Sequence, residues 1–295
     1  MAHRKRPIAA QHKDVCLREI GGSGAPVILV PSLINPPHIL DLDEEVSLGK
    51  AIAGMGQRAL LVDWGEARKR RDLNVGDHVE QLLVPLLRGL GEPAALVGYC
   101  LGGTMAIAAA NRTQVERVAT LAGPWNFSRY PEASRKSLQN LWNGSAEAAA
   151  RFQLLPMEVL QAAFWSLDPT RTASKFAKFA DTDPGGDEAR RFVTLEDWAN
   201  DGEPLPLPAA RELMEDFFGA DLPGKGQWCV GGQKMTDELS VPVLHCTATS
   251  DGITPGETAP AGERRAIAAG HVGMIVGSAR GVLHESLGDF LAPCR

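Results

Sequence analysis

Short runs of consecutive apolar residues recur along the chain, and they do not alternate with polar residues. They occupy 25–31 (APVILVP), 59–63, 94–98, 115–122 and 241–247. Each run is strand-sized and contains Val, Leu or Ala, and the first lies between Gly-rich and Pro-rich segments. Runs of this kind predict strands that are buried on both faces. About 25 residues precede the first predicted strand.

Helical patterns separate these predicted strands. Apolar residues recur at helical spacing over 48–55, 79–90 and 103–111, and a last helix is expected over 281–291. Buried strands that alternate with helices are typical of a mostly parallel, doubly wound α/β sheet with helices on both faces.

The interval 124–240 interrupts this alternation, because no comparable apolar run occurs within it. It contains helical segments such as 209–218 and a Pro-rich stretch at 203–208. Five of the six tryptophans lie in it: Trp125, Trp142, Trp165, Trp198 and Trp228. We interpret it as a helical lid inserted over the carboxyl edge of the sheet, between core segments 1–123 and 241–295. A second independent domain is the alternative.

Composition narrows the class of protein. The 295 residues include 44% hydrophobic and 22% charged residues, which is ordinary globular usage. The formal net charge of −6 argues against general nucleic-acid binding, which needs a basic face. We expect no membrane-spanning segment, because no apolar run approaches the ~18 residues that a span needs. The basic N-terminus lacks the apolar stretch of a secretory signal.

Cysteine usage predicts a reducing compartment. The odd number of widely spaced cysteines does not resemble a disulfide framework, and it indicates a cytoplasmic protein. They are Cys16, Cys100, Cys229, Cys246 and Cys294. No closely spaced Cys pair occurs, so we expect neither a metal site nor another cofactor.

The segment 96–104 (LVGYCLGGT) carries the candidate chemistry. It reads as a nucleophile elbow, Gly-x-Ser-x-Gly, with Cys100 in the serine position between Gly98 and Gly102. The sharp strand-to-helix turn leaves no room for a Cβ at the two glycines. A helix starting after Cys100 favours a thiolate there, and the Leu101 N–H is a candidate oxyanion donor. The alternative is a buried, structural cysteine.

A thiol nucleophile needs a base, and the base needs an orienting acid. In this fold the acid and then the base follow the nucleophile along the chain. Asp251 lies in a turn just after the last predicted core strand, and His271 lies in the Gly-flanked loop GHVG before the final helix. We therefore predict a triad of Cys100, Asp251 and His271.

Other residues compete for these roles. Asp63 ends a strand that comes too early in the chain, and Asp251 itself has the alternative of a simple turn residue. His245 is expected to pack inside a strand, and His284 within a helix. His38 and His78 precede the nucleophile, which is the wrong order.

The loop after the first predicted strand should supply a second oxyanion donor. Its prolines have no N–H, so the amides of Ser32 and Leu33 are the candidates. The basic run 68–71 could meet a phosphate-bearing substrate, but a solvated loop is the favoured interpretation.

With these residues, the chain resembles the polyhydroxyalkanoate synthase family within the α/β-hydrolase fold, as an unusually short member. The resemblance rests on the motifs VPSLINPPHILDL (30–42), LLVDWG (60–65), GYCLGGTMA (98–106), ATSDGITP (248–255) and GHVGMIVGSAR (270–280). It implies a Cys–His–Asp triad that polymerises hydroxyacyl-coenzyme A and releases coenzyme A. On the matching motifs, Cys100 is the nucleophile, Asp251 the acid and His271 the base.

Three functions follow from these observations. The first is an acyltransferase that uses (R)-3-hydroxyacyl-CoA thioesters, forms a covalent acyl-cysteine and makes a polyester. The second is a thioesterase, esterase or polyester depolymerase that resolves the same intermediate with water. The third is a protein without catalytic activity that binds polymer granules or a synthase partner. A homodimer is a candidate arrangement, with the tryptophan-rich lid as its contact surface.

Overall fold

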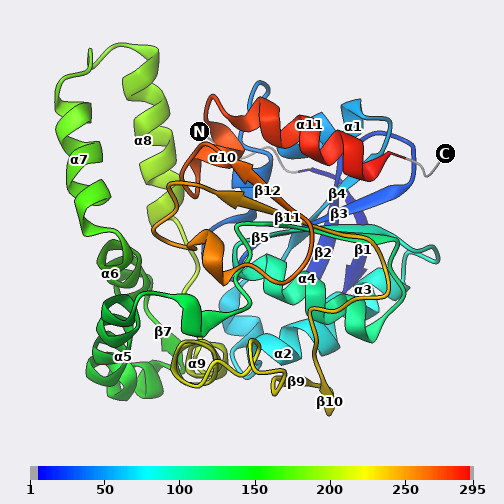
Figure 1. Ribbon diagram of the computed structural model, residues 1–295, viewed down its shortest axis with the longest axis horizontal. Coiled ribbons are helices and arrows are strands. Elements are labelled where there is room, and N and C mark those ends of the chain that lie inside the picture. The colour runs from blue at the N-terminus through cyan, green and yellow to red at the C-terminus, as the bar shows by residue number, and fades with distance from the viewer. Residues whose placement is uncertain (1–5, 293–295) are drawn as a thin grey trace.

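A computed structural model describes residues 6–292, and its centre is an eight-stranded sheet (Figure 1). The strand order is β1-β2-β4-β3-β5-β6-β11-β12. β1 and β2 are antiparallel to their neighbours, whereas the remaining strands run parallel. The strands are β1 (Ile8–His12), β2 (Val15–Gly21), β3 (Pro26–Val30), β4 (Arg58–Asp63), β5 (Ala95–Tyr99), β6 (Arg117–Leu121), β11 (Val243–Ala248) and β12 (Arg264–Ile267).

The five predicted strands are present as β3, β4, β5, β6 and β11, but the strand predicted at 25–31 is not the first of the sheet. β1 and β2 precede it, and β12 was also missed. β2 was missed because the charged residues Arg18 and Glu19 interrupt its apolar pattern. Arg18 pairs with Asp63 and Glu19 pairs with Arg58, each at 2.7 Å, and both partners lie on the neighbouring strand β4. β12 is an edge strand in which three of four residues are exposed.

Helices cover both faces of the sheet, as Figure 1 shows. One face carries α1 (Leu48–Gly54), α10 (Gly273–Val276) and α11 (Arg280–Leu291). The other carries α2 (Val75–His78), the π-helix Val79–Leu83, α3 (Val84–Arg88) and α4 (Leu101–Arg112). Along β3 the side chains alternate between the two hydrophobic clusters, because successive residues of a strand point to opposite faces.

The interval 124–240 is mostly helical. It contains α5 (Glu132–Phe152), α6 (Met157–Leu167), α7 (Pro169–Ala180), α8 (Asp187–Asn200), α9 (Leu207–Arg211) and the π-helix Glu212–Gly219. Two short strand pairs join β7 (Leu154–Leu155) to β8 (Leu205–Pro206) and β9 (Cys229–Val230) to β10 (Gln233–Lys234).

Part of this interval shares a core with the sheet. Phe217 and Trp228 are fully buried in the same cluster as Ile28 and Val30 of β3. By contrast, α7 and α8 form a hairpin at the left of Figure 1 that stands beside the sheet. Four of the interval's tryptophans are buried, whereas Trp165 on α6 is 49% exposed. The division at residues 124 and 240 stays a prediction.

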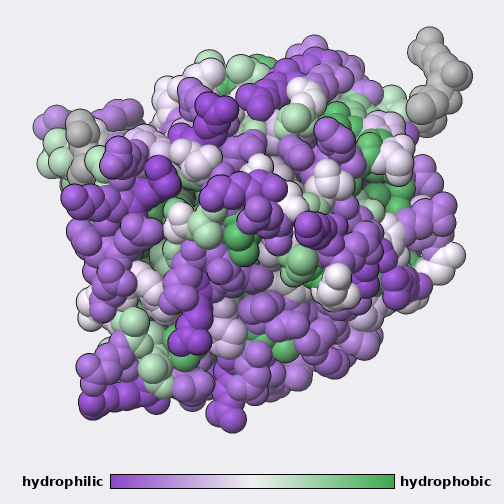
Figure 2. All heavy atoms as spheres, turned by 60° about the horizontal axis from the view of Figure 1, so that its bottom comes forward, coloured by the Kyte–Doolittle hydropathy of each residue, from purple (hydrophilic) through white to green (hydrophobic). Residues whose placement is uncertain are grey.

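The surface is mainly hydrophilic on the face drawn in Figure 2, and its apolar side chains lie in small, separate groups. Within residues 6–292, no helix combines the length and the apolar character needed to cross a bilayer.

Candidate active site

Cys100 occupies a strained turn between β5 and α4. Its backbone has φ 56° and ψ −131°, a positive φ that costs a residue with a Cβ about 1–3 kcal/mol. Two hydrogen bonds fix this turn: the Cys100 N–H donates to the Leu121 carbonyl at 2.9 Å, and the Gly103 N–H donates to the Cys100 carbonyl at 2.8 Å. The thiol is held at the carboxyl end of β5, where it is partly exposed.

Close backbone contacts explain the two glycines that flank this turn. A Cβ on Gly98 would lie 2.3 Å from the Gly102 carbonyl oxygen, and one on Gly102 would lie 2.0 Å from the Val30 carbonyl oxygen. Neither contact can be relieved by rotating a side chain, because backbone atoms form both. The spacing Gly98-x-Cys100-x-Gly102 is therefore required for α4 to pack this closely on β3 and β5.

Asp251 and His271 lie together, on loops that follow neighbouring strands. The Ser250 N–H donates to the Ala269 carbonyl at 2.9 Å, which aligns the loop after β11 with the loop after β12. Nδ1 of His271 lies 2.7 Å from Oδ2 of Asp251. Oδ1 of Asp251 accepts the N–H groups of Ile253 and Thr254, at 2.9 and 2.8 Å. Both oxygens of the buried carboxylate are thus hydrogen-bonded.

The electrostatics of His271 link it to both Asp251 and Cys100. Burial lowers the pKa of His271, but the charges of Asp251 and Cys100 and the hydrogen bond to Asp251 outweigh burial and raise that pKa to about 10. These neighbours therefore favour the imidazolium form of His271. The structure therefore places His271 in contact with Asp251 and within electrostatic reach of Cys100, an arrangement that the predicted roles of nucleophile, base and acid require.

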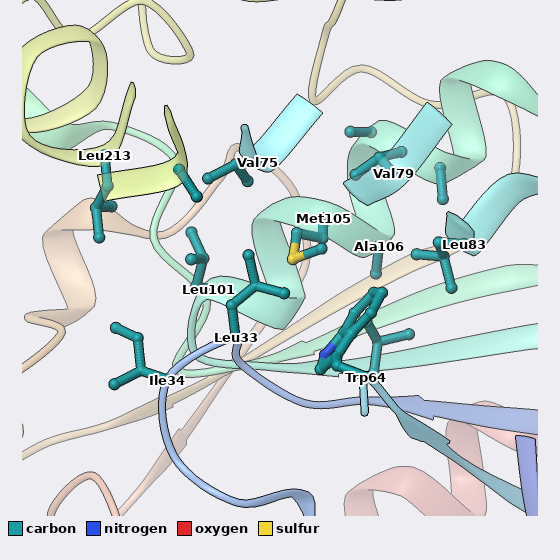
Figure 3. Close-up of a cluster of buried hydrophobic side chains, with 14 of the residues drawn as sticks. Leu33, Ile34, Trp64, Val75, Val79, Leu83, Leu101, Met105, Ala106 and Leu213 are labelled. Carbon is teal, nitrogen blue, oxygen red and sulfur yellow. The ribbon is translucent and has the colours of Figure 1, made fainter. Parts of the chain in front are cut away.

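The predicted oxyanion donors lie on two segments that meet beside Cys100. Leu33 comes from the loop after β3, and Leu101 is the first residue of α4, whose N–H has no acceptor within its own helix. Figure 3 shows their side chains in one buried cluster. In the same loop the Ile34 N–H donates to Ser32 Oγ at 3.3 Å, so that amide is already engaged. The amides of Ser32 and Leu33 remain the candidates.

Two buried tyrosines beside the site were missed by sequence reasoning. Tyr99 precedes Cys100; its ring lies 5.1 Å from that of His271, and its hydroxyl donates to the His271 carbonyl at 3.2 Å. Tyr130 follows the 3-10 helix Phe127–Arg129, and burial followed by the charge of Cys100 raises its pKa. The position of Tyr99 inside the motif was a usable signal, whereas nothing local marks Tyr130.

The residues that competed for the acid and base roles lie in other environments, outside the pair of Asp251 and His271. Asp63 is paired with Arg18, and His245 is fully buried and bonded to Thr120 Oγ1 at 2.9 Å. His38 and His284 are half-buried, on the 3-10 helix Pro37–Leu40 and on α11. Cys294 lies outside the described residues.

The basic run 68–71 is only partly the solvated loop that we expected. Arg68, Lys69 and Arg71 are exposed, but Arg70 is 5% exposed and its Nη1 lies 3.0 Å from Nε2 of His78. Burial lowers the pKa of Arg70 to about 10, and burial together with the Arg70 charge lowers the pKa of His78 to about 3. These two side chains belong to the packing beneath Trp64.

Comparison with curated sequences finds poly(3-hydroxyalkanoate) polymerase subunits, each named PhaC. The protein of Haloarcula marismortui is 25% identical over 272 residues, which cover 86% of this chain and 57% of that protein. The protein of Allochromatium vinosum is 25% identical over 316 residues, covering 97% and 88%. The Haloferax mediterranei protein is covered to 58%, so the chain spans little more than half the length of the haloarchaeal relatives. No protein-family profile matches the chain.

Solved structures with a similar arrangement have the α/β-hydrolase fold. A lipase-esterase related protein of Clostridium acetobutylicum superposes with a TM-score of 0.58 at 13% identity, covering 94% of this chain and all of that one. A monoacylglycerol lipase of Paleococcus ferrophilus gives 0.56 at 17% identity, covering 94% and 98%. The predicted α/β-hydrolase fold and the resemblance to polyhydroxyalkanoate synthases are thus confirmed.

Proposed function

We propose that this chain is a cysteine-dependent acyltransferase that acts on 3-hydroxyacyl-coenzyme A thioesters and extends a polyester. The observation that carries the proposal is the strained turn at Cys100 beside the His271–Asp251 pair. The similarity to poly(3-hydroxyalkanoate) polymerase subunits supports the choice of substrate and product. The substrate is proposed in its (R) form by the same resemblance.

The first step transfers the acyl group to the enzyme. The Cys100 thiolate attacks the thioester carbonyl carbon, and the resulting oxyanion accepts hydrogen bonds from the Leu101 N–H and from Leu33 or Ser32. When the intermediate collapses, the carbon–sulfur bond to coenzyme A breaks. The imidazolium of His271 donates its proton to the departing thiolate, while Asp251 keeps the ring oriented through Nδ1.

The second step moves the acyl group to a hydroxyl. Neutral His271 removes the proton from the hydroxyl of a hydroxyacyl chain, and the oxygen attacks the acyl-cysteine carbonyl. An ester bond forms, and the Cys100 thiolate leaves and re-forms the pair with His271. A cysteine suits this sequence because transfer between two thiols is nearly thermoneutral, so the acyl-enzyme remains activated.

Hydrolysis is the second candidate, and the fold neighbours favour it. Several solved α/β-hydrolase relatives are named as lipases or esterases. The same acyl-cysteine would then be attacked by water, and the product would be a free hydroxy acid. Exclusion of water from the site decides between these outcomes.

The experiment follows coenzyme A release and product length with 3-hydroxybutyryl-CoA. The proposal predicts chains longer than the dimer, whereas monomeric acid alone would support the hydrolase. If no thioester released coenzyme A and no ester were hydrolysed, a binding role at a polymer granule would remain. Cys100→Ala should abolish turnover, and Cys229→Ala is the matched control, because Cys229 is an exposed thiol outside the site.

The cellular setting is part of the proposal. Cys16, Cys100, Cys229 and Cys246 are all free thiols, which suits a reducing cytoplasm. Growing polyester and a granule surface are the proposed partners, with a homodimer as the proposed assembly. Size-exclusion chromatography with light scattering, with and without substrate, measures that assembly.

A further inference from the structure

The end of α8 is hydrogen-bonded to the loop that carries the candidate oxyanion donors. Trp198 Nε1–H donates to the Pro36 carbonyl at 2.9 Å, and the Asn35 side-chain amide donates to the Ala199 carbonyl at 3.2 Å. The Glu203 N–H donates to the Ile34 carbonyl at 3.1 Å. Three successive residues of the loop are therefore each held by the segment 198–203, which we call the α8 exit.

A glycine allows this close approach. A Cβ on Gly202 would lie 2.9 Å from the Ile34 carbonyl oxygen and 2.6 Å from the Met157 side chain. The backbone of the α8 exit is thus packed directly on the backbone of the loop, so the two segments cannot shift independently without losing these contacts.

The Glu203 side chain extends the contact to a second loop. Its Oε2 accepts the N–H of Ala67 at 3.1 Å, at the start of the 3-10 helix Ala67–Arg70 that follows β4. Its carboxylate also raises the pKa of the buried Arg70 guanidinium, against the larger effect of burial. Through its backbone and its side chain, Glu203 joins the loop after β3 to the loop after β4.

The other side of the loop after β3 is also fixed. Trp64 Nε1–H donates to the Pro31 carbonyl at 3.2 Å, and Leu33 packs in the cluster with Leu101 and Met105 (Figure 3). The loop is therefore held between the start of α4 and the α8 exit. Its freedom to move away from Cys100 depends on whether the α8 exit stays in place.

We propose that Asn35 and Glu203 are positioning residues that hold loop 32–36 at the distance needed to stabilise the oxyanion. The inference rests on the proposed function. Oxyanion donors act only when they lie about 2.7–3.1 Å from the developing charge. A shift of about 1 Å in such a group can slow a reaction by about 100-fold. The hairpin α7–α8 is thereby connected, through hydrogen bonds, to the acylation step.

Two reactions of Cys100 distinguish an effect on the position of loop 32–36 from a general disturbance of the site. Acylation by 3-hydroxybutyryl-CoA develops an oxyanion, whereas alkylation by iodoacetamide is a displacement at a saturated carbon that develops none. We expect Glu203→Ala and Asn35→Ala to slow acylation by about 10- to 100-fold, mainly through kcat rather than KM. Alkylation of Cys100 should stay within about twofold of the wild-type rate, because oxyanion donors do not contribute to it.

Glu203→Gln tests the contact itself, because its side-chain oxygen can still accept the Ala67 N–H; it should restore most of the acylation rate. Glu188→Ala is the control, since Glu188 lies on α8 before the α8 exit, is 65% exposed and pairs with Lys178 at 3.2 Å.

Each other outcome overturns the inference. Unchanged acylation in both alanine variants would show that the loop keeps its position without the α8 exit. A parallel loss of alkylation and acylation would show that the variants disturb Cys100 itself. Wild-type protein that is alkylated at Cys100 but releases no coenzyme A from the thioester would overturn the proposed function, and the inference with it. Active wild type with equally active variants overturns the inference alone.

Discussion

His271 lies 2.7 Å from Asp251 through Nδ1 and Oδ2, although twenty positions separate the two residues along the chain. The parallel pair β11–β12 produces this contact, because both residues lie on loops at the same end of adjacent strands. Asp251 accepts hydrogen bonds from two further backbone N–H groups, so its position does not depend on the imidazole alone. The carboxylate is thus oriented to stabilise a proton on His271.

Replacing Asp251 by Asn should impair catalysis and move its pH dependence. Burial alone lowers the pKa of His271, and the Asp251 charge is the largest of the effects that raise it to about 10. Without that charge the imidazolium form is lost at lower pH. We expect kcat to fall by about 10²–10⁴-fold and the alkaline limb of the pH–rate profile to shift to lower pH. Both are measured as coenzyme A release between pH 6 and 10.5.

The same variant has a consequence for stability. The pKa of His271 is higher in the folded protein than in the unfolded chain, where it is near 6.5, so protonation of His271 stabilises the folded state. This stabilisation is complete below pH 6.5 and is lost as the pH rises toward 10. The difference in free energy of unfolding between wild type and Asp251→Asn should therefore shrink across that range. A difference that grows with pH would contradict this assignment.

Gly98→Ala should destabilise the protein, because the new methyl group would meet the Gly102 carbonyl at 2.3 Å. Overpacking of this kind costs about 1–3 kcal/mol, measurable by denaturant unfolding. Gly144→Ala on α5 is the matched control: its Cβ would meet nothing within 4 Å, and it should stabilise the helix by about 0.5–1 kcal/mol. Equal stability of the two variants would argue against a close contact at Gly98.

His78 should make the protein sensitive to acid. Burial, followed by the Arg70 charge, lowers its pKa to about 3 in the folded state, against about 6.5 unfolded. As the pH falls, His78 is therefore protonated in the unfolded chain at a higher pH than in the folded protein. The free energy of unfolding consequently decreases between pH 6.5 and 3. A His78→Gln variant should show a shallower decrease. Above pH 7 the two slopes should coincide, which provides the internal control.

The central strands and the turn at Cys100 could be predicted because their signals are local. Buried parallel strands are continuous apolar runs, and the turn requires glycines at fixed positions around Cys100. β2 was missed because Arg18 and Glu19 interrupt its apolar pattern, and only its cross-strand ion pairs with β4 explain these charges. The edge strand β12 was missed because three of its four residues face solvent.

The remaining parts of the site depend on contacts between distant segments. Asp251 and His271 could be nominated from chain order and turn residues, but their hydrogen bond depends on the pairing of β11 with β12. Tyr130 and Glu203 carry no local signal, since their surroundings come from loops far away in the sequence. The arrangement of the helices in the interval 124–240 is likewise set by packing rather than by local pattern.

The most direct test of the account is the intact mass of the protein quenched after brief mixing with 3-hydroxybutyryl-CoA, followed by peptide mapping of the adduct. We predict a mass increase of one hydroxybutyryl group or a short oligomer, mapped to Cys100 and absent from Cys100→Ala. An acyl group on a different residue, or coenzyme A release by Cys100→Ala at the wild-type rate, would contradict the account.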